Sequence, residues 1–89
     1  MNKKNNKVGK RLCCLSNQVI EKEKMIRITK VNDSLIFNNF NAKGRSVYFL
    51  LDAANATNQN KLFNTIKRKL KFNLSELEKL EILKLISVN

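Results

Sequence analysis

The sequence predicts an α+β domain, a two-layer sandwich in which a small antiparallel sheet of about three strands packs against C-terminal helices. Strand-like patterns occupy residues 25–51, helix-like patterns occupy residues 53–87, and a chain of 89 residues is the size of one domain. Because the strands precede the helices rather than alternate with them, an antiparallel sheet is favoured. We expect residues 10–89 to form this single domain.

Two irregular segments precede the predicted sheet. Residues 1–9 are polar and basic with almost no apolar content, which is typical of a flexible arm. Residues 11–18 are predicted to be a turn-rich entry, in which Ser16 and Asn17 favour a turn.

Three strands are predicted in order along the first half of the domain. Residues 25–31 alternate apolar with polar side chains, residues 32–34 are turn formers, and residues 35–37 resume the pattern, so the two runs predict a hairpin. After a loop, Gly44 gives the backbone the freedom to turn with a positive φ. The β-prone residues 46–51 then predict a third strand.

Helices are predicted in the second half. Asp52 is a candidate N-cap for a short Ala-rich helix that starts at Ala53. A second helix is predicted over residues 61–71, because apolar residues recur four apart on one face. That apolar face consists of Leu62, Ile66 and Leu70.

A capping box predicts where the last helix begins. The Ser75 side chain is expected to accept from the Glu78 amide, and the Glu78 carboxylate to accept from the Ser75 amide. The helix is predicted to run to about residue 87. Its inward face is expected to consist of Leu77, Leu80, Leu83 and Ile86.

The charge of the chain indicates a polyanionic partner. Eighteen basic and seven acidic residues give a net charge of +11, and residues 1–11 and 61–71 carry +5 each. Nucleic acid is the commonest partner for such a protein, and an anionic membrane surface is the alternative. No apolar stretch approaches the ~20 residues that span a bilayer, and no apolar stretch follows the basic N-terminus as in a secretory signal. We therefore expect a cytoplasmic protein.

The residues that usually carry catalysis or bind metals are scarce. The chain has no histidine, and Cys13 and Cys14 are adjacent, so neither a Cys-x-x-Cys pair nor a zinc ligand set is present. Gly9 and Gly44 are too far apart to form a phosphate-binding loop. We expect a protein that is not an enzyme and has no metal, cofactor or small-molecule substrate. The two thiols are expected to be partly buried, and redox sensing is the alternative role.

The basic segment of the second helix is the first candidate binding surface. When the apolar face is buried, Lys67, Arg68 and Lys71 point to solvent. An arginine can grip a phosphate with two parallel hydrogen bonds, whereas a lysine acts as a point charge. The alternative interpretation is a solvated helix face in a lysine-rich chain.

Arginines and one tyrosine provide the remaining candidates. Arginine occurs only four times, so its joint use in binding anions is a reasonable hypothesis. Tyr48 and Phe49 fall on opposite faces of their strand, and Tyr48 can either stack on a base or pack in the core. The predicted RNA-binding residues are Arg11, Arg27, Lys43, Arg45, Lys67, Arg68, Lys69 and Lys71, with Tyr48 for base stacking.

The chain resembles the YlxR family of small bacterial RNA-binding proteins over residues 10–87. The matching segments are Arg11-Leu12-Cys13, Met25-Ile26-Arg27-Ile28, Gly44-Arg45-Ser46-Val47-Tyr48 and Lys67-Arg68-Lys69-Leu70. The chain departs from the family pattern at Ser46 and Val47, where the family has Gly-Ala, and at Phe37, where many members have an acid.

The resemblance implies a two-layer α+β fold and binding of RNA. It also implies association with the transcription and translation machinery, and contact with ribonuclease P RNA as a modulator of tRNA maturation. Arg11, Arg27, Arg45 and Arg68 would be the anion-contacting residues. The alternatives are a ribosome-associated structural protein bound to ribosomal RNA, a DNA-binding protein of the nucleoid type, and an adaptor for an acidic protein.

Overall fold

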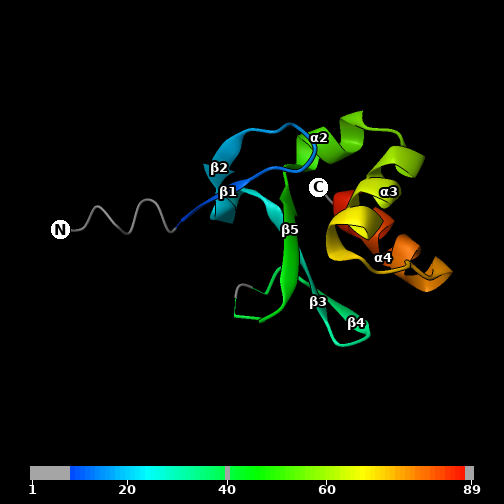
Figure 1. The fold of residues 1–89 in the computed structure, drawn as a ribbon. Coiled ribbons are helices and arrows are strands. Elements are labelled where there is room, and N and C mark those ends of the chain that lie inside the picture. The colour runs from blue at the N-terminus through cyan, green and yellow to red at the C-terminus, as the bar shows by residue number, and fades with distance from the viewer. Residues whose placement is uncertain (1–8, 40, 88–89) are drawn as a thin grey trace.

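Two antiparallel sheets and three α-helices make up residues 9–39 and 41–87, the part of the chain that the computed structural model describes (Figure 1). This arrangement confirms the predicted α+β fold. No helix in this part combines the length and the apolar character that crossing a bilayer requires. The elements are β1 (Lys10–Leu12), β2 (Val19–Glu21), the 3₁₀ turn η1 (Lys22–Lys24), β3 (Ile26–Val31), β4 (Ser34–Phe37), β5 (Arg45–Phe49), α2 (Leu51–Ala56), α3 (Gln59–Leu70) and α4 (Glu76–Ser87).

The larger sheet has the three predicted strands, in the order β4-β3-β5. The β3–β4 hairpin closes where Val31 pairs with Ser34. β5 pairs antiparallel with β3 from Ile26–Phe49 to Lys30–Arg45 and forms one edge of the sheet. Gly44 enters β5 with φ 147°, and a Cβ atom there would overlap the Lys30 carbonyl oxygen, so the predicted glycine turn is confirmed.

The core lies between this sheet and the helices. Ile28, Val47 and Phe49 project from one sheet face and are buried together with side chains from α3 and α4. Full burial of such a side chain contributes roughly 1.5–3 kcal/mol, so the contact between the two layers supplies much of the stability. The helical side chains of this core are Leu62, Ile66 and Leu70 from α3, as predicted, and Ile82 and Ile86 from α4.

The β1–β2 hairpin was not predicted. Residues 11–18 were expected to be an irregular entry, but the chain pairs Arg11 with Ile20 on either side of a turn in which Asn17 has φ 60°. Three-residue strands are too short to show alternation in the sequence. The Gly9 carbonyl accepts a hydrogen bond from the Lys22 amide (2.7 Å), so Gly9 belongs to the hairpin. The rest of the predicted arm lies outside the described residues.

Three predicted helix boundaries are wrong. α2 begins at Leu51 with Leu50 as the N-cap, and Asp52 lies in its first turn without capping it. α3 begins earlier than expected because the Asn58 side chain accepts from the Lys61 amide (2.8 Å). It ends at Leu70, so Lys71 follows the helix instead of belonging to it.

The start of α4 is confirmed, but its predicted inward face is partly wrong. The capping box forms in both directions, from the Ser75 amide to Glu78 Oε1 (2.9 Å) and from the Glu78 amide to Ser75 Oγ (3.2 Å). Leu77 and Leu80 are nevertheless 67% and 55% exposed, while Ile82 and Ile86 are buried. Apolar residues lie on most sides of α4, so periodicity alone does not determine which face is buried.

Arg27 fixes the loop between β4 and β5 on the sheet face opposite the helices. Its side chain donates from Nε to Ser46 Oγ (3.1 Å), from Nη1 to the Asn39 carbonyl (2.7 Å) and from Nη2 to the Ala42 carbonyl (2.8 Å). The residue is only 8% exposed. The hypothesis that Arg27 contacts an external anion does not agree with these internal bonds, and we leave it out of the candidate interface.

Replacing this arginine should therefore affect stability. We expect Arg27→Gln to lower the free energy of unfolding by about 2–4 kcal/mol, because the loop loses charge-assisted hydrogen bonds from a buried guanidinium. The matched control is Arg45→Gln on the exposed start of β5, which should change stability by less than about 0.5 kcal/mol. Urea unfolding measures both, and equal effects of the two substitutions would refute the structural role of Arg27.

Candidate nucleic-acid interface

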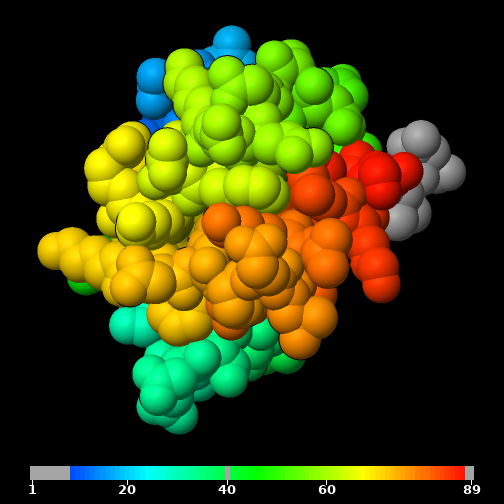
Figure 2. All heavy atoms as spheres, turned by 90° about the vertical axis from the view of Figure 1, so that its right-hand side faces the viewer, coloured from blue at the N-terminus to red at the C-terminus, as the bar shows by residue number. Residues whose placement is uncertain are grey.

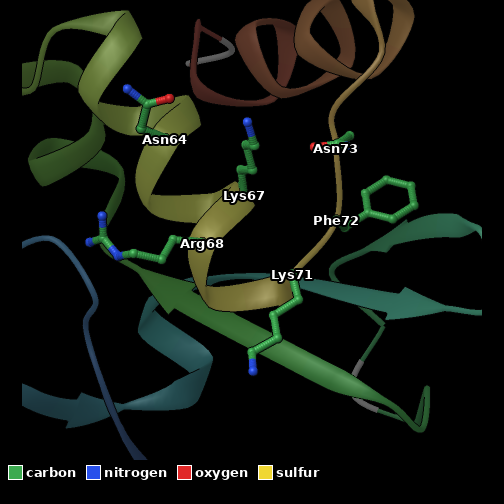
Figure 3. A pocket seen from close by; sticks show the side chains of 6 residues that line it. All are labelled: Asn64, Lys67, Arg68, Lys71, Phe72 and Asn73. Carbon is green, nitrogen blue, oxygen red and sulfur yellow. The ribbon is translucent and has the colours of Figure 1, made fainter.

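The outward face of α3 forms one wall of an open groove. Because one side of the helix packs on the sheet, Lys67 and Arg68 point away from the core, as predicted. The groove has a volume of about 510 Å³, within the range of ligand pockets. Figure 3 shows its side chains fanning out from the C-terminal end of α3 and the segment after it. They are Asn64, Lys67, Arg68, Lys71, Phe72 and Asn73, called the α3 groove below.

Lys71 occupies a backbone conformation that disfavours a side chain. It follows the last turn of α3 with φ 54° and ψ 49°, and its amide donates to the Lys67 carbonyl. Glycine or asparagine usually takes this position, because a Cβ in the left-handed region costs about 1–2 kcal/mol. The other non-glycine residues with positive φ in the described part are Asn17, Asn32 and Asn38. Of these four positions, the one that lines the groove is occupied by a lysine.

The cations of the groove are not neutralised from within the described part of the chain. Its two ion pairs join Lys24 to Glu21 (3.5 Å) and Lys79 to Glu76 (3.7 Å), and neither pair includes a residue that lines the groove. Lys67, Arg68 and Lys71 therefore form a cluster of like charges without a carboxylate partner among these residues. The partial negative charge at the C-terminus of α3 offsets their repulsion in part.

A second hollow of about 260 Å³ lies where β1, β5 and α3 meet. Arg11, Tyr48 and Lys69, which the sequence singled out, all line it. The Arg11 guanidinium lies 5.9 Å and the Arg27 guanidinium 5.8 Å from the centre of the Tyr48 ring. The structure thus brings these predicted residues together in one place, called the Tyr48 hollow below, although Arg27 reaches it only from inside the fold.

The electrostatic environment of Cys14 connects the Tyr48 hollow to the α3 groove. Burial raises the pKa of this thiol to about 11, while the positive charges of Lys69 and Arg68 act in the opposite direction. Arg68 lines the α3 groove and Lys69 lines the Tyr48 hollow, so the thiol lies within the field of both cation groups. Arg68 and Lys69 are also neighbours in α3, so the two cation groups adjoin at this point of the helix and together are called the basic surface below.

Cys13 is fully buried, and Cys14 is partly buried; both are free thiols. Burial raises the pKa of Cys13, but hydrogen bonds from Ser16 and from backbone amides outweigh it, so the net pKa is lowered. The expectation of a partly buried thiol is confirmed for Cys14, whereas Cys13 is more deeply buried than expected.

Arg45 extends the basic surface past the end of the groove. It pairs in register with Lys30, and the Lys30 ammonium lies 5.9 Å from the centre of the Phe72 ring. Both cations therefore project from the helix-covered side of the sheet, near the Phe72 end of the groove. Lys43 is exposed in the loop before β5 and lines neither the α3 groove nor the Tyr48 hollow.

Beyond Lys67 a smaller hollow of about 150 Å³ continues between α3 and the start of α4. It contains Phe63, whose ring centre lies 5.8 Å from the Lys79 ammonium. Figure 2 shows the molecular face to which α3 and α4 contribute, with the β3–β4 hairpin below them. In residues 9–39 and 41–87, no group of three histidine, cysteine, aspartate or glutamate side chains is placed to hold a metal ion.

The sequence interpretation missed four residues of this surface. The residues that the sequence does not single out are Lys30, Asn64, Phe72 and Asn73. One signal was available for Asn64, which lies three and four positions before Lys67 and Arg68 and so shares their helix face. No signal of this kind exists for Lys30, because its approach to Phe72 depends on how the helix packs on the sheet.

A scan of protein-family models gave no match to this chain, and searches of curated proteins and of solved structures gave none either. The resemblance to the YlxR family therefore stays a prediction that rests on the residues quoted for it.

The environment of Cys14 gives a chemical test of the joined surface. Lys69→Gln should slow alkylation of Cys14 by iodoacetamide at pH 9, because losing the positive charge raises the thiol pKa and lowers the thiolate fraction. The higher nucleophilicity of a more basic thiolate offsets this only in part. Tandem mass spectrometry separates Cys14 from Cys13, and Lys61→Gln at the other end of α3 is the control. An unchanged rate in Lys69→Gln would show that the charge does not act on the thiol.

Proposed function

We propose that the protein binds RNA through the phosphate backbone, with the α3 groove as its central contact surface. The observation that carries the proposal is the cluster of Lys67, Arg68 and Lys71, whose charges have no carboxylate partner among the described residues. Lys71 belongs to this cluster despite an unfavourable backbone conformation. A ligand that supplies several negative charges in a row fits this arrangement.

The arginine and lysine side chains of the groove are expected to contact phosphates in different ways. Arg68 can donate two parallel hydrogen bonds to one phosphate and fix its position, while Lys67 and Lys71 neutralise neighbouring phosphates and release counterions. Arg11, Lys69 and Arg45 continue the positive surface on either side. Cations, amides and a phenyl ring bind and orient a ligand, so we propose a binding protein rather than an enzyme.

The shape of the site favours RNA over duplex DNA. A protein that reads B-DNA inserts a protruding helix or ribbon into the major groove. The cations of α3 instead line a hollow between that helix and the segment 71–73. RNA offers irregular backbones and unpaired segments that can enter such a hollow. The resemblance to the YlxR family makes ribonuclease P RNA, in the cytoplasm, the first RNA to test.

The salt dependence of binding tests the electrostatic mechanism. If about five phosphates are neutralised, log K should fall with log salt at a slope of roughly −3.5 to −4.5. Lys67→Gln with Lys71→Gln should make the slope less steep by about 1.4–1.8, because two phosphate contacts are lost. The charge-matched control, Lys61→Gln with Lys84→Gln, removes two lysines outside the groove and should leave the slope unchanged. Filter binding at several salt concentrations measures it, and a flat response of the wild type would reject the proposal.

The backbone of Lys71 separates a binding role from a structural one. Lys71→Gly should raise the free energy of unfolding by about 0.5–1 kcal/mol, since it removes a side chain from the left-handed region, and should raise Tm by a few degrees. The same substitution should weaken RNA binding. Asn32→Gly, at another position with positive φ, is the control and should leave binding unchanged. A stabilised Lys71→Gly protein with full RNA affinity would contradict the role given to Lys71.

The identity of the RNA is a separate question with its own experiment. Crosslinking in cells followed by sequencing should recover ribonuclease P RNA above its abundance if the protein modulates tRNA maturation. Recovery of ribosomal RNA would favour the ribosome-associated alternative. Tighter binding of duplex DNA than of RNA at equal salt, or a stable complex with an acidic protein in the absence of nucleic acid, would favour the other two alternatives.

A further inference from the structure

We propose that Phe72 is a stacking platform for an unpaired nucleobase, so that the RNA segment in the α3 groove is single-stranded. This inference rests on the proposed function and adds the class of RNA that the site recognises. Three properties of the groove support it: an aromatic ring, two amide side chains and three cations line the same open hollow.

The backbone that carries Phe72 is held in place by the end of α3. The left-handed turn at Lys71 allows both the Lys71 amide and the Phe72 amide (3.2 Å) to donate to the Lys67 carbonyl. Phe72 also packs against the core on one side while its ring lines the groove. A ring whose position is fixed before binding loses little conformational entropy when a base stacks on it.

Figure 3 shows how the neighbouring side chains lie around this ring. Phe72 points over the β-sheet on one side of the segment after α3, and Lys71 extends toward β5 on the other. A base on Phe72 therefore has a cation beside it that can reach its flanking phosphate. The Lys30 ammonium, 5.9 Å from the ring centre, places a second positive charge near the same base.

Amide groups complete the surroundings of a base. Asn64 and Asn73 line the groove, and neither side chain makes a hydrogen bond to another residue of the described segments. Each amide offers both donors and an acceptor, which is what the edge of a nucleobase requires. In a duplex these edges are paired and the base faces are stacked, so only an unpaired nucleotide can present both to the groove.

Tyr48 is a poorer platform than Phe72. One cation lies near the Phe72 ring, the Lys30 ammonium at 5.9 Å, whereas two guanidinium groups lie 5.8–5.9 Å from the centre of the Tyr48 ring. One of them belongs to Arg27, which is buried and held by three hydrogen bonds, so this contact persists when a ligand arrives. The Tyr48 hollow is also about half the volume of the α3 groove, 260 against 510 Å³. We therefore assign the stacking role to Phe72 and leave Tyr48 as support for Arg11.

A fluorescent base analogue tests this assignment directly. The probe is a short single-stranded RNA that carries one 2-aminopurine, whose fluorescence falls when it stacks. The full-length protein should quench the probe and bind it more tightly than the same strand annealed to its complement. Phe72→Leu keeps an apolar side chain but removes the aromatic face, so it should abolish the quench. It should also weaken single-strand binding by about 5- to 150-fold, the range that corresponds to 1–3 kcal/mol per stacked base.

Matched variants separate stacking from charge and from folding. Lys71→Gln should make the salt slope less steep by about 0.7, because it removes one phosphate contact to a single strand, and it should keep the quench. Phe37→Leu changes another partly buried phenylalanine outside the groove and should leave the quench intact. An RNA with an abasic site in place of 2-aminopurine completes a double-mutant cycle. Wild type and Phe72→Leu should bind this abasic RNA equally well, because it has no base at that position to stack on the ring.

The outcomes distinguish the inference from the function on which it rests. The stacking role would be overturned if salt-dependent binding were equal for single strand and duplex. It would also be overturned if the quench persisted in Phe72→Leu. Either result would leave binding to the phosphate backbone in place. Absence of salt-dependent RNA binding would overturn both. If the quench depends on Phe72, and the double-mutant cycle shows that Phe72 and the base interact, the results would support both the stacking role and RNA binding.

Discussion

The packing of α3 on the apolar face of β3 and β5 is the interaction on which the interface depends. Leu62, Ile66 and Leu70 are buried against the sheet, and this fixes the rotation of the helix about its axis. Lys67 and Arg68 are then directed to solvent by geometry alone. The turn after the helix directs Lys71 and Phe72 to the two sides of the same groove. The basic surface is thus a consequence of how the core is filled.

Arginine has two separate uses in this small domain. Arg27 satisfies carbonyls of the β4–β5 loop from within the fold, and the neighbouring Thr29 and Ser46 hydroxyls share a hydrogen bond (2.8 Å). Arg68 has no carboxylate partner among the described residues and lines the groove. Both belong to segments that resemble the YlxR pattern, so sequence position alone does not separate the structural guanidinium from the exposed one. Burial and hydrogen bonding make that distinction.

The sequence was informative wherever one local pattern had one physical solution. The β3–β4 hairpin, the glycine turn at residue 44 and the capping box of α4 were all predictable, because each depends on neighbouring residues. The inward face of α4 was not, since apolar residues lie on most sides of that helix and only tertiary packing chooses Ile82 over Leu80. The same limit applies to the site. The cations of α3 follow from periodicity, whereas the place of Phe72 depends on a left-handed turn that Lys71 does not signal.

Several residues of the α3 groove are not the ones that would make the fold most stable. A lysine takes a position that suits glycine, like charges cluster without a carboxylate partner in the described segments, and a phenylalanine lines an open hollow. Each choice costs stability in a domain whose total stability is only about 4–13 kcal/mol. Sequences tend to agree with their fold at every level except where function requires otherwise. A polyanion that binds only the folded state would offset these costs by mass action.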